Sequence, residues 1–304
     1  MAEVRAPHAV WGVAPIVTGV VVSLAVVAAA CHPPDAPTVP APVPDPEAAR
    51  DPINLADPAA LHASAEGVLR ELVAALPARP RARVEGVTFV RDSALGEVNA
   101  YATCGAAGPI VAVSDGLLVV AAHLAMGTAT DERFETDRAR AYLGWLAEHG
   151  LAPPPVSFYP AAYHGDRYKL RRQREVFEEQ LAFVLGHELA HHYLGHLPCS
   201  RGNALEELGR VAADRVPAFN QLAEHAADTA AVKNLLAAGR QRDGYAWTED
   251  GALLVIAAFH HRRPATARDV FRAFERTHPF PHLRAPAVVL AAELWHDSGG
   301  ILPP

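Results

Sequence analysis

The sequence predicts an α+β fold, mostly α, in which a small sheet packs on one helix. Short β-rich runs cover residues 84–91, 97–103 and 109–113, with a glycine-containing turn before the last run. From residue 116 onward, apolar residues recur at three- and four-residue steps, which is the helical period. Hydrophobic residues make up 50% of the 304-residue chain, enough for the core of a single domain.

The helical segments follow from periodicity and capping residues. A first amphipathic helix is expected before Pro77, Ser114 is expected to cap the helix after the strands, and Asp166 offers a cap to a later one. The segment 152–163, rich in proline and aromatic residues, predicts a packed surface loop, with a lid over a cleft as the alternative. The expected helices are 61–76, 116–126, 132–148, 166–197, 216–238, 251–261, 266–276 and 284–295.

The N-terminal segment predicts export and tethering. Arg5 stands in a short polar lead, residues 13–30 are largely apolar, and small residues precede Cys31. This pattern resembles a bacterial lipoprotein signal peptide over 1–30, which implies lipidation of Cys31; a transmembrane anchor and a plainly cleaved signal are the alternatives. Residues 31–58, dominated by Pro, Ala and Asp, predict an extended tether, and residues 59–304 predict the folded domain.

Location and charge narrow the possible partners. The lipoprotein resemblance implies a membrane-anchored protein that faces the periplasm of the bacterial cell envelope, with the outer membrane favoured because His32 rather than aspartate follows the cysteine. A net charge of -7 and a pI near 6.1 provide no basic surface for nucleic acid. Cys104 and Cys199 can pair in an oxidising compartment or remain free thiols. Nothing in the sequence predicts the oligomeric state.

One pentapeptide, His187-Glu188-Leu189-Ala190-His191, gives the strongest chemical signal. On a helix the two histidines stand one turn apart and about 40° around the axis, so both imidazoles reach a common point. Glu188 can reach a water on the open side of a metal held there, which makes it the candidate general base. The pattern predicts half of a catalytic site for one Zn²⁺ ion.

A third ligand is needed, because catalytic zinc usually takes three protein ligands and a water. Glu224 lies 33 positions after His191 (224 − 191), inside another segment of helical period. Asp228 shares its face one turn later and can accept a hydrogen bond from the far nitrogen of a ligand histidine, which we assign to His187. His225 is a competing ligand, but it points about 100° away around the helix.

Together, these residues resemble the HtpX/BepA-type zinc metallopeptidases, which are glutamate-ligated zincins of the CAAX-prenyl-protease type. The resemblance implies a zincin-like metallopeptidase fold, with the sheet packed on the helix that carries the zinc motif. No later segment approaches the length of a membrane span, so the resemblance is to the soluble, periplasmic lipoprotein branch. His196, nine positions after His187, also matches the family pattern.

The resemblance extends to substrate binding and catalysis. Asn99-Ala100-Tyr101 is similar to the family's edge strand, which implies that these residues bind an extended substrate. Thr277-His278-Pro279 and the trailing Arg284 match a C-terminal segment, which implies that His278 or Arg284 stabilises the oxyanion as a second electrophile. Residues 127–168 depart from the family pattern as an insertion, which we expect to lie near the cleft and to influence substrate choice.

The predicted function is that of a zinc metalloendopeptidase that hydrolyses peptide bonds of envelope or misfolded proteins. Glu188 would take a proton from zinc-bound water and pass it to the leaving amine. One alternative is a non-catalytic periplasmic chaperone or assembly factor on the same fold. Zinc binding alone does not require Glu188, which argues against it. A zinc hydrolase of cell-wall peptides is the other alternative, and the sequence contains nothing that discriminates against it.

Overall fold

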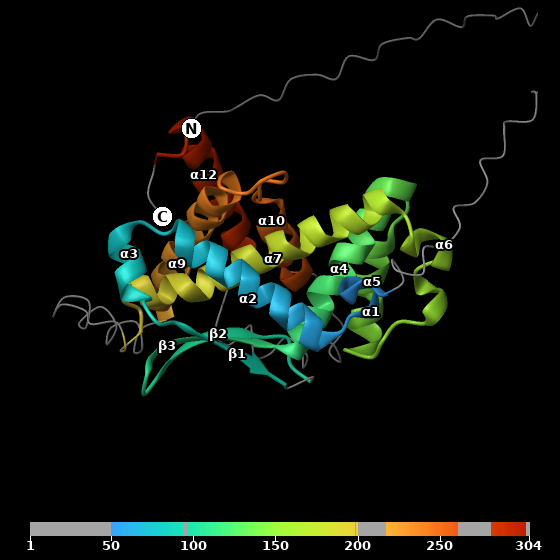
Figure 1. Cartoon of the computed structure of the whole chain (residues 1–304), viewed down its shortest axis with the longest axis horizontal. Coiled ribbons are helices and arrows are strands. Elements are labelled where there is room, and N and C mark those ends of the chain that lie inside the picture. Colours follow the sequence, from blue (N-terminus) through green and yellow to red (C-terminus); the bar gives the residue numbers. More distant parts are fainter. Residues whose placement is uncertain (1–49, 94–95, 198, 200–216, 261–280, 302–304) are drawn as a thin grey trace, which may run out of the picture. The chain divides into compact units, whose positions relative to one another are not determined.

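A computed structural model describes residues 50–93, 96–197, 199, 217–260 and 281–301 (Figure 1). All of these residues belong to one compact unit, Ala41–Pro304. They form a small sheet and many helices, so the predicted α+β, mostly α fold is confirmed. The predicted signal peptide, the lipidation residue Cys31 and the expected helix 266–276 lie outside the described residues.

The sheet has three strands, β1 (Thr88–Asp92), β2 (Ala100–Gly105) and β3 (Gly108–Ser114), in the order β1-β3-β2. β1 runs parallel to β3, and β2 pairs with β3 in an antiparallel hairpin. Within the described part of the chain, β2 therefore has one edge that pairs with no other strand. A free edge exposes backbone groups that can receive an extended peptide.

The helix α7 (Arg167–Tyr193) is the centre of the helical part, and its core-facing residues are buried over most of its length. The helices α2 (Pro58–Ala75), α4 (Asp115–Phe134), α9 (Pro217–Arg240) and α10 (Asp250–His260) pack against it, as do β2 and β3 (Figure 1). The last helix, α12 (Pro281–Asp297), packs on α9 and α10. The zinc-motif helix thus lies between the sheet and α9, as the resemblance implies.

The predicted caps form as expected. Ser114 accepts a hydrogen bond from the backbone N–H of Leu117 at the start of α4, and Asp166 accepts one from Lys169 at the start of α7. Several boundaries differ from the prediction; α4, for example, ends at Phe134 rather than at residue 126. Residues Ala78–Arg83 form the short helix α3, so β1 begins four residues later than the predicted strand, and α7 ends at Tyr193 rather than near Pro198.

The folded part begins earlier than residue 59, because the end of the predicted tether is helical and packed. The short helix α1 (Pro52–Leu55) is capped by Asp51 and buries Ile53. Asp51 also accepts a hydrogen bond from Gln173, and Asn54 accepts one from the ammonium group of Lys169, at 3.0 and 2.8 Å. Lys169 is fully buried, and this burial lowers its pKa to about 8. Composition misled the prediction, because proline is favoured in the first turn of a helix as well as in linkers.

The insertion 127–168 contributes the end of α4, the helix α5 (Arg138–His149), the 3-10 turn η2 (Val156–Phe158) and the short helix α6 (Ala161–His164). The expected loop within it is packed, since Tyr159 is buried and donates a hydrogen bond to the carbonyl of His123 on α4. Leu151 reaches Gly116, where an added Cβ would lie 3.0 Å from the leucine side chain. That side chain therefore lies close to the segment that leads into β2. Among the described residues, no helix combines the length and the apolarity that crossing a membrane requires.

Candidate metal centre

His187 and His191 lie one turn apart on α7 and direct the same ring atom toward one point. Their Nε2 atoms are 3.1 Å apart, and their ring centroids are 4.8 Å apart. His187 is 2% exposed, whereas His191 is partly accessible. A helix brings residues i and i+4 together in this way, so the sequence spacing alone predicts the arrangement.

Glu224 comes from α9, which packs along α7. One of its carboxylate oxygens, Oε2, is 3.2 Å from His187 Nε2, and the other, Oε1, is 3.5 Å from His191 Nε2. The side chain is 4% exposed, so its charge is held inside the protein. Burying a carboxylate there is favourable only if positive charge faces it.

The three groups fit a zinc ion. Their candidate ligand atoms all lie within 4.8 Å of one another. In a tetrahedral site with metal bonds of about 2.0–2.1 Å, neighbouring ligand atoms are about 3.3 Å apart. The two histidine Nε2 atoms are 3.1 Å apart, and their distances to the two carboxylate oxygens of Glu224, Oε2 and Oε1, are 3.2 and 3.5 Å, which bracket this value. Two imidazoles and one carboxylate are also the donor set that leaves a fourth, open position on catalytic zinc.

Glu188 follows His187 directly and is 2% exposed. It is about 100° further around α7 than His187, so helix geometry directs its carboxylate beside the ligand cluster rather than into it. The catalytic role itself stays a prediction.

Asp228 supports His187 from behind. Its Oδ1 atom is 2.8 Å from His187 Nδ1, so the ring donates a hydrogen bond there and keeps Nε2 free of a proton for a metal. The carboxylate is fully buried. Burial raises the pKa of Asp228, but the charge and hydrogen bonds of Arg284 outweigh that effect and lower the pKa to about 2. Asp228 is therefore a carboxylate at neutral pH.

Arg284, from α12, lies against Asp228, and its predicted role at the oxyanion stays a prediction. Its guanidinium binds Asp228 through two hydrogen bonds, Nε to Oδ2 at 2.7 Å and Nη2 to Oδ1 at 2.6 Å, and it is 4% exposed. Such a bidentate pair behind His187 favours a supporting role over direct contact with an oxyanion. The sequence contains no local signal for this pairing, because the two residues are 56 positions apart and on different helices.

The electrostatics of the cluster favour a cation. Burial lowers the pKa of His187, but hydrogen bonds with Asp228 and Glu224 outweigh burial and raise the pKa to about 10. The two carboxylates thus draw a positive charge to the ring. A divalent ion on Nε2 would supply that charge in place of the proton.

The predicted substrate-binding residues stand at the start of the edge strand. The backbone of Asn99 is fixed by Ser114, since each donates one hydrogen bond to the other, at 2.9 Å in both cases. The side-chain Oδ1 of Asn99 is buried and has no hydrogen-bond partner within the described part of the chain. Ala100 is fully buried, and Tyr101 is half-buried. His278, the other predicted electrophile, lies outside the described residues.

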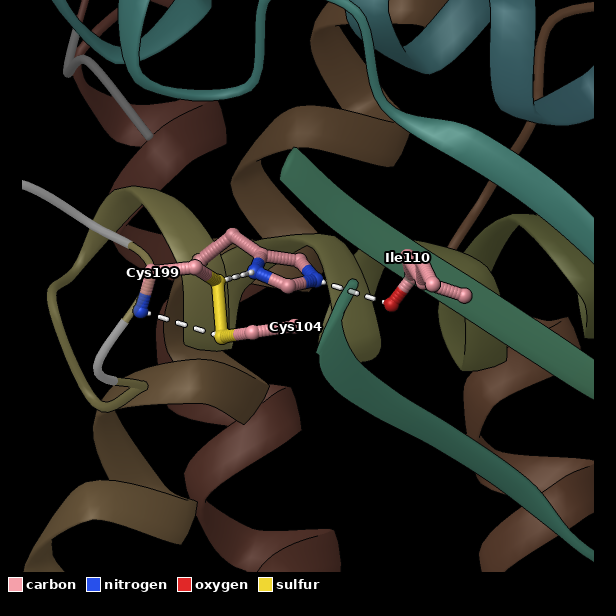
Figure 2. Close-up of a disulfide and its surroundings, with 4 residues drawn as sticks. Cys104, Ile110 and Cys199 are labelled. Carbon is pink, nitrogen blue, oxygen red and sulfur yellow. Dashed lines mark hydrogen bonds between the residues drawn. A yellow bond between two sulfur atoms is a disulfide. The ribbon is translucent and has the colours of Figure 1, made fainter. Parts of the chain in front are cut away.

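The structure also resolves the cysteine question, because Cys104 at the end of β2 forms a disulfide with Cys199 (Figure 2). The Cα atoms are 5.4 Å apart, an ordinary separation for a disulfide. His192 lies against this bond, with its Nδ1 atom 3.4 Å from Cys199 Sγ and its Nε2 atom 3.0 Å from the carbonyl oxygen of Ile110. Sequence spacing gives no hint of this contact, since the residues involved come from three different elements.

Three features are typical of the zincin class of peptidases. They are the His-Glu-x-x-His motif on α7, a glutamate from a second helix and the edge strand beside them. A family model agrees: peptidase family M48 matches residues 60–290. The chain belongs to this family, that of the HtpX/BepA-like zinc metallopeptidases, and the resemblance seen in the sequence is confirmed. No curated protein and no solved structure matches the chain significantly.

Proposed function

We propose that this peptidase is a zinc-dependent metalloendopeptidase that cleaves envelope or misfolded proteins. The observation that carries the proposal is the convergence of His187, His191 and Glu224 with spacings close to those of tetrahedral zinc, next to the buried carboxylate of Glu188. A chaperone that only bound zinc would have no need of Glu188. The family supplies the peptidase activity, and the donor set supports zinc as the metal.

Each residue of the site would have a separate role in catalysis. Zinc, when bound, would polarise the scissile carbonyl and a water. Glu188 would accept the proton of the attacking water and deliver it to the leaving amine nitrogen. Asp228 and Arg284 would keep His187 in the tautomer and orientation that leave Nε2 available. The buried position of the cluster limits competing water, which strengthens each of these interactions.

Extended, flexible chains are the substrates that the edge strand β2 supports. A peptide that adds to its free edge gains backbone hydrogen bonds, which depend little on side-chain identity. The buried Oδ1 atom of Asn99 has no hydrogen-bond partner among the described residues and would be an acceptor for a substrate N–H at the start of this edge. We therefore expect Asn99→Ala to lower kcat/KM about tenfold without loss of zinc, because one buried hydrogen bond to the substrate is removed.

We propose the bacterial cell envelope as the site of action, with the chain held at a membrane, favouring the outer one, by a lipid on Cys31. The support comes from the signal-like sequence of the first thirty-one residues and from the disulfide, which is typical of oxidising compartments. Metabolic labelling with a fatty-acid analogue should mark the wild-type chain but not Cys31→Ser, which should also leave the detergent phase. Equal labelling of both chains would contradict lipidation at this residue.

The test of the peptidase activity uses the full chain. Metal analysis of the purified protein should give one zinc per chain, and casein should be cleaved. Glu188→Gln should retain the zinc and lose activity at least about 100-fold, because the amide cannot accept the proton. Glu175→Gln, about three turns earlier on the same helix, is the matched control and should keep full activity. A zinc-loaded wild type that cleaves neither casein nor any unfolded protein would overturn the proposal.

A further inference from the structure

Directly after α7, the chain folds back onto the end of this helix, which carries His187 and His191. Gly195 has a φ of 84°, a left-handed conformation that glycine adopts without strain and that reverses the chain here. The next residue, His196, donates its backbone N–H to the carbonyl of His191 at 2.9 Å. Its ring meets the ring of His191 edge-on, with the two Nδ1 atoms 3.0 Å apart and the centroids 5.0 Å apart.

The ligand geometry decides which of the two rings donates the hydrogen bond between their Nδ1 atoms. His191 presents Nε2 to His187 and Glu224, so its remaining proton sits on Nδ1 when Nε2 binds a metal. His191 then donates to His196, whose Nδ1 is the acceptor. His196 thus gives His191 the kind of support that Asp228 gives His187.

The disulfide fixes the far end of the same stretch. Cys199, three residues after His196, is bonded to Cys104 and also donates its backbone N–H to Cys104 Sγ at 3.0 Å (Figure 2). Cys104 belongs to β2, which pairs along its length with β3. The position of His196 is therefore set at one side by the end of α7 and at the other by a covalent bond to the sheet.

Both cysteines are partly exposed. The carbonyl of Ile110 can only accept, so His192 donates to it through Nε2 and presents a lone pair on Nδ1 to Cys199. A thiol at Cys199 would donate its S–H to that lone pair. A dithiol reductant would transfer two electrons and two protons to the two sulfurs and become a disulfide itself.

We propose that His196 is a positioning residue for His191, and that the Cys104–Cys199 disulfide holds it in place, so that the redox state of this bond sets how tightly the centre retains its metal. The inference rests on the proposed zinc site. Opening the disulfide would free residue 199 from β2 and restore conformational freedom to the stretch that carries His196. The hydrogen bond to His191 would then be present for a smaller fraction of the time, and His191 would leave the metal more readily.

The experiment measures zinc release from the full chain to an excess of a chromophoric chelator. A water-soluble trialkylphosphine reduces the disulfide, since phosphorus takes the oxygen of one water and the two hydrogens go to the sulfurs. Release from the reduced protein should be about tenfold faster than from the oxidised protein, the loss typical when a supporting partner of a metal ligand is removed. Cys104→Ser/Cys199→Ser should release zinc fast with or without the phosphine, whereas Cys31→Ser should respond like the wild type.

Variants of His196 separate positioning from a merely structural role. His196→Leu should release zinc about tenfold faster even with the disulfide intact, because the leucine side chain fills the space of the ring but cannot accept the hydrogen bond from His191. His196→Asn, whose Oδ1 can take the place of Nδ1, should restore slow release. Substitution of cobalt for zinc should show a changed visible spectrum for the leucine variant only. Equal release from oxidised and reduced wild type, or from His196→Leu and wild type, would overturn the proposal.

These readouts need no peptidase activity. A protein whose zinc release responds to reduction but which cleaves nothing would support the positioning role and refute the proposed function. A protein that cleaves casein equally well in both redox states and releases zinc at one rate would refute the positioning role alone. Reduced wild type and the His196 variants keep the test decisive if the double serine variant fails to fold.

Discussion

Replacing Asp228 with asparagine should have two effects that can be measured separately. It should weaken zinc binding, and it should lower the unfolding free energy of the metal-free protein. The carboxylate is fully buried and receives three hydrogen bonds, one from His187 and two from Arg284. An amide has only one oxygen, so its NH₂ group must face at least one of these donors. The partner of a ligand histidine typically contributes 10–100-fold in metal affinity, and we expect the zinc Kd to rise by about that factor, or about 1.4–2.7 kcal/mol.

The second effect is the loss of unfolding free energy in the metal-free protein. Arg284 is 4% exposed and would keep its charge without the facing carboxylate. Breaking a buried ion pair on one side costs about 3–5 kcal/mol, so urea unfolding of the chelated protein should show a loss of this order. Arg284→Met removes the charge and tests the same pair from the other side. The double variant should be less destabilised than the sum of the two single variants, because it leaves no unpaired charge.

Competition with a zinc chelator gives the affinity, and urea titration of the metal-free protein gives the stability. Asp243→Asn, an exposed aspartate on the turn after α9, is the matched control and should change neither. If Asp228→Asn bound zinc within twofold of the wild type and unfolded at the same urea concentration, the assignment of Asp228 as the support of His187 would be wrong.

Three further outcomes follow from the structure. Burial lowers the pKa of His123 from its usual value of 6.5 to about 4, so between these pH values the unfolded chain binds a proton that the folded chain excludes, and stability falls on acidification. Between about pH 7 and 4.5 the wild type should lose about 2 kcal/mol more unfolding free energy than His123→Phe in urea titrations, and parallel pH curves would refute this. Gly116→Ala should destabilise by about 1–3 kcal/mol, because its Cβ would lie 2.2 Å from the carbonyl oxygen of Glu97 at the approach to β2; an unchanged melting temperature would show that this contact is relieved cheaply. Removing zinc should lower the unfolding free energy by about 3 kcal/mol relative to protein at a free zinc concentration of 100 times Kd, as measured by thermal unfolding, and a melting temperature independent of zinc would argue against the site.

The sequence predicts α7 and its two metal ligands well, because the residues that indicate them lie close together in the chain. His187 and His191 are related by one helical turn, and their supporting cap, Asp166, and apolar stripe lie on the same helix. Glu224 and Asp228 are likewise one turn apart, so their shared face follows from spacing once a helix is assumed. That this face turns toward α7 was inferred from the need of a catalytic zinc for a third protein ligand.

Contacts between elements distant in sequence could not be predicted from pattern. Arg284 binds Asp228 across 56 positions, and Cys199 binds Cys104 across 95. No periodicity encodes which surfaces of two helices or of a strand and a loop meet. The early start of the fold escaped prediction for another reason, since Pro52 and Pro58 begin helices but read by composition as parts of a linker.

The hydrogen bonds that join Asp51 and Asn54 to α7 determine where this chain can be shortened for study. Lys169 sits fully buried near the start of the helix that ends in the metal ligands, and its ammonium group donates to Asn54. A chain that began at residue 59 would lose that acceptor together with Asp51, which accepts a hydrogen bond from Gln173 near the N-terminal end of α7. The metal affinity of such a truncated protein would report the damage at this end of α7 as well as the chemistry of the centre. Preparations meant to measure zinc should therefore begin before Arg50.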